Sequence, residues 1–521
     1  MSWREEVDGI EQRRAMAQQM GGEEAVGRQH DRGRLTIRER IDALADAGTF
    51  REEGPLSGYS ELDDTGRLKN FTPANYVLGI ADVDGRPCVI GGEDFTQRGG
   101  SPTPAGLRKS VYAEDLALRY QLPLIRFLEG GGGSVTGTRG KGGGGARPMG
   151  DPVYSRSRFK SIADVMEAVP VVSAAVGAVA GFPAARLAAS HFSVMTKGTS
   201  QVLVAGPAVV ERALGEKLTK EELGGHKVHM RSGVVDNLAH DELDAMRQIR
   251  RFLSYLPRNA SRLPERASAT RPDADPGDRC EEVLLEIVPR ERRQVYKMRK
   301  VIDAVLDRDS FFEMSALYGR SQITGLARLN GFPVGIFAND PHFYGGSMTA
   351  DGARKVTRFI QLCDTFHLPI VSFVDEPGFM IGSGAESSGT IRCGVEAINA
   401  TVRSRVPWVS VIVRKTYGVA AAAHFGPNGQ VYCWPSAEGG ALPIEGGVAV
   451  AFRREIEAAE DPDAKRRELE ERLSRGRSPF PRAEAFGVHD LIDPRRTRPV
   501  LCDWIELAYP AFESAVRLGE A

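Results

Sequence analysis

Two glycine turns are the segments of this chain whose residue types and spacing could carry chemistry. In each, an apolar run typical of a buried strand ends in glycine and continues into small residues typical of a helix, at Gly181 and at Gly418. A strand that turns through glycine into a helix points several amide N–H groups at one spot. Such a pair of turns could stabilise two oxyanions that face each other. The alternative is that both glycines only permit close packing of helix against strand.

Ionisable side chains near the turns are weaker candidates for catalytic residues than the turns themselves. Arg414 is expected to orient the second turn or to meet a carboxylate rather than to act as a base. His424 is expected to be a packing histidine, with a proton shuttle as the alternative. Asp375 and Glu376 place two carboxylates after a strand, but no aromatic platform accompanies them, so a glycosidase site is discarded.

The elements that would position these turns alternate between strands and helices. Residues 1–47 have helical spacing, and residues 76–92 predict two strands around the turn Asp84-Gly85. A helix, a short buried strand, a second helix and the apolar strand before Gly181 follow. This alternation predicts parallel sheet with helical crossovers.

The second half of the chain repeats the first. At a shift of 246 residues, Gly79, Gly85 and Pro87 correspond to Gly325, Gly331 and Pro333, Pro123 to Pro369, and Glu129 to Asp375. At a shift of 237, Val169-Pro170 corresponds to Val406-Pro407 and Gly181 to Gly418. We therefore predict an internal duplication, with domains at residues 1–262 and 280–521 and a proline-rich, charged linker at 263–279.

The composition excludes several classes of protein. The chain has 68 Lys and Arg against 69 Asp and Glu, a balance that argues against a nucleic-acid binder. It contains no apolar run long enough to predict a membrane span, and its charged start does not resemble a signal peptide. Its 6 cysteines form no CxxC pair, so neither a zinc ribbon nor a disulfide framework is expected. We expect a cytoplasmic enzyme without a metal, a membrane or a nucleic-acid partner.

Specific motifs link the chain to a known family. They include FVDEPGF at residues 373–379, RKTYG at 414–418, GRLTIRERI at 33–41 and TKEELGG at 219–225. With these motifs, the chain resembles the carboxyltransferase (β) subunits of biotin-dependent acyl-CoA carboxylases, the propionyl-CoA and methylcrotonyl-CoA carboxylase group. The resemblance implies an α/β fold of two tandem crotonase-like (ClpP/crotonase) ββα superhelix domains. It also implies a ring-shaped hexamer whose site lies where the N-domain of one subunit meets the C-domain of its neighbour.

The resemblance also assigns roles to the turns. The N-domain would hold the acyl-CoA, with the amides of Gly181 and Phe182 receiving the thioester enolate. The C-domain would hold carboxybiotin, with the amides of Val419 and Ala420 receiving the ureido oxygen of biotin. Binding roles would fall to Gly418, Tyr417 and Ala422, the last at a position where family members differ in acyl preference.

The chain departs from the family in its first half. Pro183 has no N–H to donate, and the bulk of Phe182 would narrow the space over the acyl group. The glycine-rich stretch 130–150 is either a surface loop or a contact for phosphate or pantetheine, made by Arg139, Lys141 and Arg147 with glycine amides.

The function implied is transfer of CO₂ from carboxybiotin to the α-carbon of an acyl-CoA such as propionyl-CoA, through an enolate held by backbone amides. Neither an Ala-Met-Lys-Met biotinylation motif nor an ATP-grasp signal is present, so a separate biotin carboxylase subunit and a biotin carboxyl carrier protein are expected as partners. The alternatives are decarboxylation of a malonyl-type CoA, a biotin-independent crotonase-like lyase, and a non-catalytic subunit of a carboxylase complex.

Overall fold

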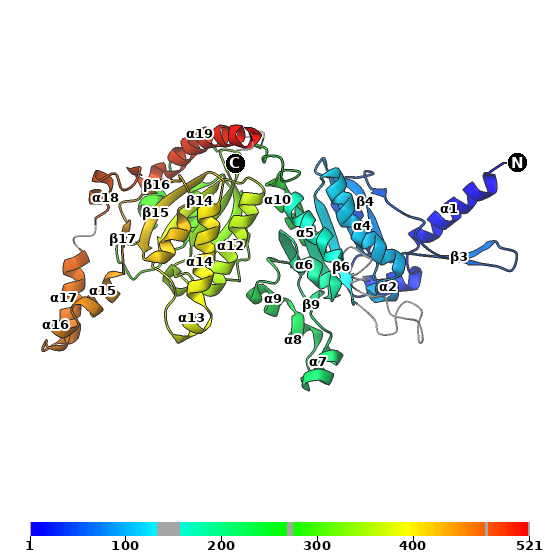
Figure 1. Ribbon diagram of the computed structural model, residues 1–521, viewed down its shortest axis with the longest axis horizontal. Coiled ribbons are helices and arrows are strands. Elements are labelled where there is room, and N and C mark those ends of the chain that lie inside the picture. The colour runs from blue at the N-terminus through cyan, green and yellow to red at the C-terminus, as the bar shows by residue number, and fades with distance from the viewer. Residues whose placement is uncertain (1, 133–156, 268–274, 475–477, 519–521) are drawn as a thin grey trace. The chain divides into compact units, whose positions relative to one another are not determined.

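The computed structural model describes residues 2–132, 157–267, 275–474 and 478–518 (Figure 1). Its internal contacts divide the chain into two compact units, Met1–Arg262 and Leu263–Ala521. Part of the segment expected to be a linker packs on the second unit, because Leu263 lies against that unit's core and the Ala267 amide donates to Gly331 O at 3.0 Å.

The first unit begins with three helices, α1 (Arg4–Gln18), α2 (Glu23–His30) and α3 (Ile37–Leu44). A capping box starts α3, since Thr36 accepts from the Glu39 amide and the Glu39 side chain accepts from the Thr36 amide. The apolar face of α3 is buried, which fixes the helix against the sheet.

The first unit is built on an eight-stranded mixed sheet in the order β1-β4-β5-β6-β7-β8-β10, with β9 paired to β7. Strands β4 and β5 form the antiparallel hairpin around Asp84-Gly85, and the strands from β5 onward pair in parallel as predicted. Their bounds are β1 (Arg51–Glu52), β4 (Tyr76–Val83), β5 (Arg86–Glu93), β6 (Leu124–Gly130), β7 (Val171–Ala180), β8 (Phe192–Thr196), β9 (Gln201–Leu203) and β10 (Asn237–Ala239). A separate hairpin joins β2 (Gly58–Leu62) and β3 (Leu68–Pro73).

The remaining helices of the first unit include α4, which packs beside β4 and β5 (Figure 1). They are α4 (Pro104–Tyr120), α5 (Arg158–Ala168), α6 (Phe182–Ala188), α7 (Pro207–Leu214), α8 (Lys220–Gly224), α9 (His226–Ser232), α10 (Glu242–Ser254) and the short 3₁₀ turn η1 (Arg98–Gly100).

The second unit has an equivalent eight-stranded sheet in the order β11-β12-β13-β14-β15-β16-β18, with β17 paired to β15. The strands are β11 (Phe312–Met314), β12 (Gln322–Leu329), β13 (Phe332–Asn339), β14 (Ile370–Glu376), β15 (Trp408–Tyr417), β16 (Gln430–Cys433), β17 (Glu438–Gly440) and β18 (Asp490–Leu491).

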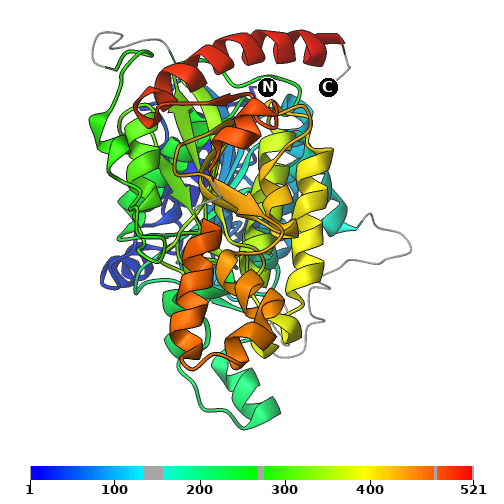
Figure 2. The same cartoon turned by 90° about the vertical axis from the view of Figure 1, so that its left-hand side faces the viewer.

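The helices of the second unit include a packed pair, α12 and α14, seen in yellow-green beside the strands (Figure 2). The set comprises η2 (Glu282–Leu285), α11 (Met298–Val305), η3 (Tyr344–Gly346), α12 (Ala350–Thr365), α13 (Ser383–Ser387), α14 (Thr390–Arg403), η4 (Val419–His424), α15 (Ile444–Ala451), α16 (Arg453–Glu457), α17 (Pro462–Ser474), α18 (Phe480–Glu484), η5 (Pro494–Arg496) and α19 (Thr497–Leu518).

The strand bounds confirm the internal duplication. Strands β4, β5 and β6 have the same lengths as β12, β13 and β14, and each pair is offset by the 246 residues seen in the sequence. Strands β7 and β15 are both 10 residues long and are offset by 237. Each unit therefore has its glycine turn at the end of the equivalent strand of its own sheet.

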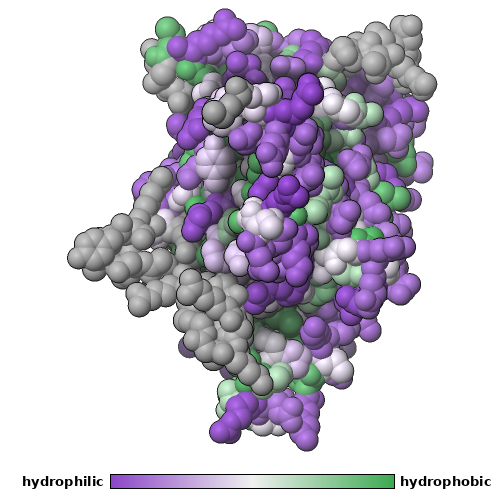
Figure 3. All heavy atoms as spheres, turned by 90° about the vertical axis from the view of Figure 1, so that its right-hand side faces the viewer, coloured by the Kyte–Doolittle hydropathy of each residue, from purple (hydrophilic) through white to green (hydrophobic). Residues whose placement is uncertain are grey.

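The face drawn in Figure 3 is mostly hydrophilic, with apolar residues in small separate groups. Among the helices that the structure describes, none combines the length and apolar character needed to cross a membrane.

Candidate functional site

The first glycine turn joins β7 to α6. Gly181 has φ 65° and ψ −128°, and its Cα is exposed at the end of an otherwise buried strand. This part of conformational space is open essentially to glycine alone, so the residue is required by the turn itself. Phe182 opens the helix and keeps its N–H, whereas Pro183 at the next position has none.

The second glycine turn joins β15 to the 3₁₀ helix η4. Gly418 has φ 64° and ψ −164°, and its own amide is used, because it donates to Gly440 O at 3.1 Å. Val419 and Ala420 follow as the first two residues of η4, where an amide N–H has no acceptor within the helix. The second turn thus offers two amides in succession, one more than Phe182 and Pro183 can offer at the matching positions.

A second glycine lies beside each turn. Gly132 and Gly378, again 246 residues apart, have φ 71° and 122°. A Cβ on Gly132 would lie 2.9 Å from Ala180 O, and one on Gly378 would lie 3.8 Å from Tyr417 O. In both units, therefore, the loop that follows β6 or β14 lies against the end of the strand that enters the turn.

Buried ion pairs anchor the first turn. On α6, Arg186 donates to both carboxylate oxygens of Glu114 on α4, at 2.9 and 3.1 Å, and to Ser110 O at 2.8 Å. Arg126 on β6 lies 3.1 Å from the same carboxylate and donates to Arg186 O. These three charged side chains are at most 2% exposed. Burial nevertheless lowers the pKa of Arg126, only partly offset by Glu114.

The side chain of Phe182 is held in place by neighbours. The Arg186 guanidinium lies 4.3 Å from the centre of the Phe182 ring, and the Phe159 ring meets it edge-on at 5.5 Å. The ring is half-buried, and its contacts with Arg186 and Phe159 hold it in position.

Neutral hydrogen bonds anchor the second turn. His424 ends η4, is fully buried, and shares a hydrogen bond of 2.8 Å between its Nδ1 and the Ser372 hydroxyl. Its carbonyl accepts from Trp408 Nε1 at 2.8 Å and from the Ser410 hydroxyl at 2.6 Å. Burial lowers the pKa of His424 to about 3, so the imidazole is neutral. This agrees with the expected packing role.

The two carboxyl groups at the end of β14 are buried and hydrogen-bonded. Asp375 accepts from the Tyr296 hydroxyl at 2.9 Å and from the Lys415 amide at 3.1 Å. Burial raises the pKa of Asp375, although Lys415 acts in the opposite direction. Glu376 accepts from the Gly378 amide at 2.9 Å.

The remaining predicted residues fall into three groups. Arg414 donates to the carbonyls of Gln294 and Glu291, at 2.8 and 3.0 Å, so it orients a backbone segment. Tyr417 is 1% exposed, whereas Ala422 is exposed on η4. Arg139, Lys141 and Arg147 lie outside the described residues.

Sequence reasoning missed the side chains that support the turns, among them Glu114, Arg126 and Ser372. One signal was present, because Arg126 interrupts an apolar strand of seven residues that is buried throughout. A buried arginine requires a buried partner, but nothing in the sequence points to Glu114 as that partner.

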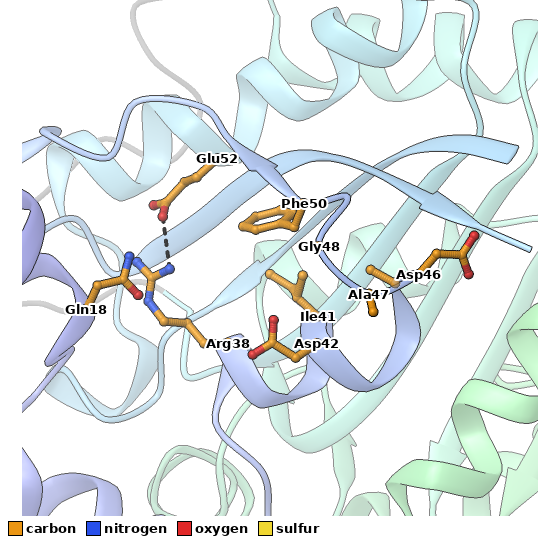
Figure 4. Close-up of a pocket in the computed structure, with 10 residues that line it drawn as sticks. Gln18, Arg38, Ile41, Asp42, Asp46, Ala47, Gly48, Phe50 and Glu52 are labelled. Carbon is orange, nitrogen blue, oxygen red and sulfur yellow. Dashed lines mark hydrogen bonds and ion pairs between the residues drawn. The ribbon is translucent and has the colours of Figure 1, made fainter. Parts of the chain in front are cut away.

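A pocket elsewhere in the first unit contains none of the turn residues. Its volume is about 530 Å³, and Ile41, Ala45 and Phe50 line it together with Arg38, which donates to Glu52 at 2.9 Å (Figure 4). Within the described ranges, no group of His, Cys, Asp and Glu side chains could hold a metal ion.

Several known proteins are similar to this chain over nearly its whole length. The family description "Carboxyl transferase domain" matches residues 28–515. The chain is 35% identical over 506 residues to the propionyl-CoA carboxylase carboxyltransferase subunit of Haloferax mediterranei, covering 96% of this chain and 95% of that protein. It is 32% identical over 504 residues to the methylmalonyl-CoA decarboxylase subunit alpha of Veillonella parvula, covering 95% and 94%.

Among solved structures, the chain is similar to transcarboxylase 12S, described as a hexamer assembly with methylmalonyl-coenzyme A and methylmalonic acid bound. The TM-score is 0.83 at 31% identity, over 98% of this chain and 96% of that one. This likeness, together with the two duplicated eight-stranded sheets, confirms the predicted α/β fold of two tandem crotonase-like domains.

Proposed function

Because this chain belongs to the carboxyl transferase domain family, we propose that it transfers a carboxyl group between biotin and the α-carbon of an acyl-CoA such as propionyl-CoA. The observation that carries the proposal is the duplicated strand–glycine–helix turn, with both glycines at positive φ. A reaction that moves negative charge between two oxygens needs two such donors and no titrating side chain at the reacting atoms.

The second turn suits the ureido oxygen of biotin. Carboxybiotin, brought by a separate carrier, supplies the CO₂ that is transferred. The amides of Val419 and Ala420 would donate to the ureido oxygen, and Gly418 has no side chain to obstruct the approach. The exposed residues Gly418, Val419 and Ala422 leave a small-residue surface that a flat ring could approach.

The first turn suits the thioester oxygen. The amides of Gly181 and Phe182 would hold the charge of the enolate that forms when the α-proton is removed. Pro183 contributes no donor, and the fixed ring of Phe182 would border the acyl group. The acyl-CoA would be held by the first unit and carboxybiotin by the second.

We extend the proposal to the partners of the chain. A biotin carboxylase subunit and a biotin carboxyl carrier protein would load and deliver the carboxyl group. The hexamer assembly of transcarboxylase 12S supports a hexamer here as well. We propose that the protein works in the cytoplasm.

The test is a reconstitution. The purified chain is mixed with a biotin carboxylase, a carrier protein, ATP and labelled bicarbonate, and each of a panel of acyl-CoAs is offered in turn. We expect label in the product of at least one short acyl-CoA. If none becomes labelled while the carboxylase loads the carrier, the proposal fails.

A second candidate is the reverse direction, decarboxylation of a malonyl-type CoA with biotin as the acceptor. It is favoured by the similarity to the decarboxylase subunit of Veillonella parvula. Biotin-dependent transfer of a labelled carboxyl group from a malonyl-type CoA to free biotin, recovered as carboxybiotin or as the CO₂ that carboxybiotin then releases, would support it. Turnover of an acyl-CoA without any biotin would instead support a biotin-independent lyase, and no turnover in any assay would support a non-catalytic subunit.

A further inference from the structure

The short strand β17 lies beside the second glycine turn and carries an acidic residue, Glu438, to which the proposed reaction gives no role. Strand β17 pairs in parallel with the last three residues of β15 (Figure 1). At the end of β17, the Gly440 carbonyl accepts from the Gly418 amide at 3.1 Å. The position of β17 therefore fixes the point at which the chain leaves β15 and enters η4.

Glu438 is the first residue of β17, and an arginine far away in the sequence binds it. Arg292 donates from Nη2 to Glu438 Oε1 at 3.2 Å, and its Nε lies 3.1 Å from Oε2. The guanidinium thus meets both oxygens of the carboxylate, an arrangement that fixes orientation as well as distance. The two side chains are only 26% and 11% exposed, so solvent screens their attraction less than that of a surface pair.

The backbone on either side of Arg292 is itself anchored to β15. Arg414, near the end of that strand, donates to the carbonyls of Glu291 and Gln294 at 3.0 and 2.8 Å. These two acceptors flank Arg292 in the sequence. Strand β17 is therefore joined to β15 twice, directly by backbone pairing and indirectly through the segment that Arg414 holds.

The first unit supports the equivalent strand in another way. Gln201 on β9 corresponds to Glu438 at the shift of 237 residues, and it donates to Glu221 on α8 at 3.2 Å. There, a neutral amide meets an acid, whereas in the second unit an acid meets an arginine. The contact made by Glu438 is therefore specific to the second turn and is not a general requirement of the repeated fold.

We propose that Arg292 and Glu438 are positioning residues, which hold β17 in register against β15 and so keep the Gly418 amide bonded to β17. This inference rests on the proposed function, because it takes the two amides that follow Gly418 as the donors to biotin. Both side chains act through the backbone of β17 rather than by contact with biotin. A misplacement of about 1 Å at the reacting groups can cost about a hundredfold in rate, so even a small shift of β17 should slow the reaction.

Hydrogen exchange of the full chain tests this support without any assay of activity. In Arg292→Met and in Glu438→Gln, each of which removes one charge of the pair, we expect the Gly418 amide to exchange at least about tenfold faster than in the wild-type chain. Arg293→Met is the matched control. It removes the neighbouring arginine, which is 74% exposed and pairs with Glu470 on α17, and should leave the exchange of Gly418 unchanged.

Two results of the exchange experiment would overturn the inference. One is an unchanged exchange rate of the Gly418 amide in both Arg292→Met and Glu438→Gln. The other is an equal rise in the exchange of the β12 and β13 amides, because general loosening of the sheet would then explain the change at Gly418.

Steady-state kinetics of carboxyl transfer test the effect on the reaction. We expect Arg292→Met and Glu438→Gln each to lower kcat by about tenfold or more. The KM for acyl-CoA should stay within about twofold of the wild-type value, because the first turn is unchanged. The double variant should be no slower than the slower single variant, because both changes break the same link. A wild-type kcat in either single variant, or fully additive losses in the double variant, would contradict the positioning role.

The two experiments also separate this inference from the proposed function. If Gly418 exchanges faster in the variants but the wild-type chain carboxylates no acyl-CoA, the proposed function alone fails. If the wild-type chain is active and the exchange of Gly418 is the same in the variants, this inference alone fails.

Discussion

The two glycine turns have nearly the same backbone but different support. Gly181 and Gly418 have φ values of 65° and 64°, and each follows a ten-residue strand. Beneath the first turn, Arg186 and Arg126 share the buried carboxylate of Glu114. Beneath the second turn, the support consists of neutral hydrogen bonds made by His424.

This difference shows what the duplicated fold constrains. The turn itself admits only glycine, so both copies keep it. The supporting side chains need only hold the following helix in place, and either an ion network or a set of hydrogen bonds can do so. The position of Arg186 corresponds to Ala423 and that of His424 to Leu187, so the two supports use different places on their helices.

The largest effect is expected from removing the shared carboxylate of the first turn. Glu114→Leu would leave two buried arginines without the carboxylate that they share and should lower the free energy of unfolding by about 3–5 kcal/mol. Urea unfolding of the wild-type and variant chains measures this change in the free energy of unfolding. At the corresponding position of the second unit, Ile360→Leu is the matched control and should cost less than about 1.5 kcal/mol. Equal costs at the two positions would contradict the distinction between the supports.

Removing a donor from the second turn should have the next largest effect. Ala420→Pro gives this turn the residue that the first turn has naturally at Pro183, so the backbone is expected to accept it. We expect kcat for carboxyl transfer to fall by about two to three orders of magnitude. Ala420→Gly, which keeps the N–H, should retain most of the activity. A loss of less than about tenfold in Ala420→Pro would show that this amide does not hold the charge.

The neutral support of the second turn should make stability sensitive to acid. His424 has a pKa of about 3 in the folded chain, below its ordinary value of 6.5, so the unfolded chain binds a proton that the folded chain does not. Stability is therefore lost as pH falls below 6.5. Between pH 6.5 and 5, the unfolding free energy of the wild-type chain should drop by about 2 kcal/mol more than that of His424→Leu. If the unfolding free energies of the two proteins fell equally between pH 6.5 and 5, the result would contradict a buried neutral imidazole.

The smallest effect is expected at the acyl side of the first turn. Phe182→Ala removes a ring that is fixed by Arg186 and Phe159, which should raise the preference for a longer acyl-CoA over propionyl-CoA by about tenfold. Ratios of kcat/KM over an acyl-CoA panel measure the change. Phe159→Ala keeps the Phe182 side chain and should shift the ratio less. An unchanged ratio in Phe182→Ala would place the acyl group elsewhere.

The sequence predicted the parts of the molecule that depend on local pattern. The duplication, the strands on either side of Asp84-Gly85 and the two glycine turns follow from periodicity and from repeated glycines and prolines. The supports could not be predicted, because their partners are far apart in the chain. Arg186 and Glu114 are 72 residues apart, and Ser372 and His424 are 52 residues apart.

The central claim is that main-chain amides at the two turns hold the charge that moves during carboxyl transfer. A crystal structure of the chain with an acyl-CoA and biotin bound tests it most directly. The account predicts the thioester oxygen within about 3 Å of the Phe182 nitrogen and the ureido oxygen within about 3 Å of the Val419 or Ala420 nitrogen. Either oxygen bound instead to an ionisable side chain, away from its turn, would contradict it.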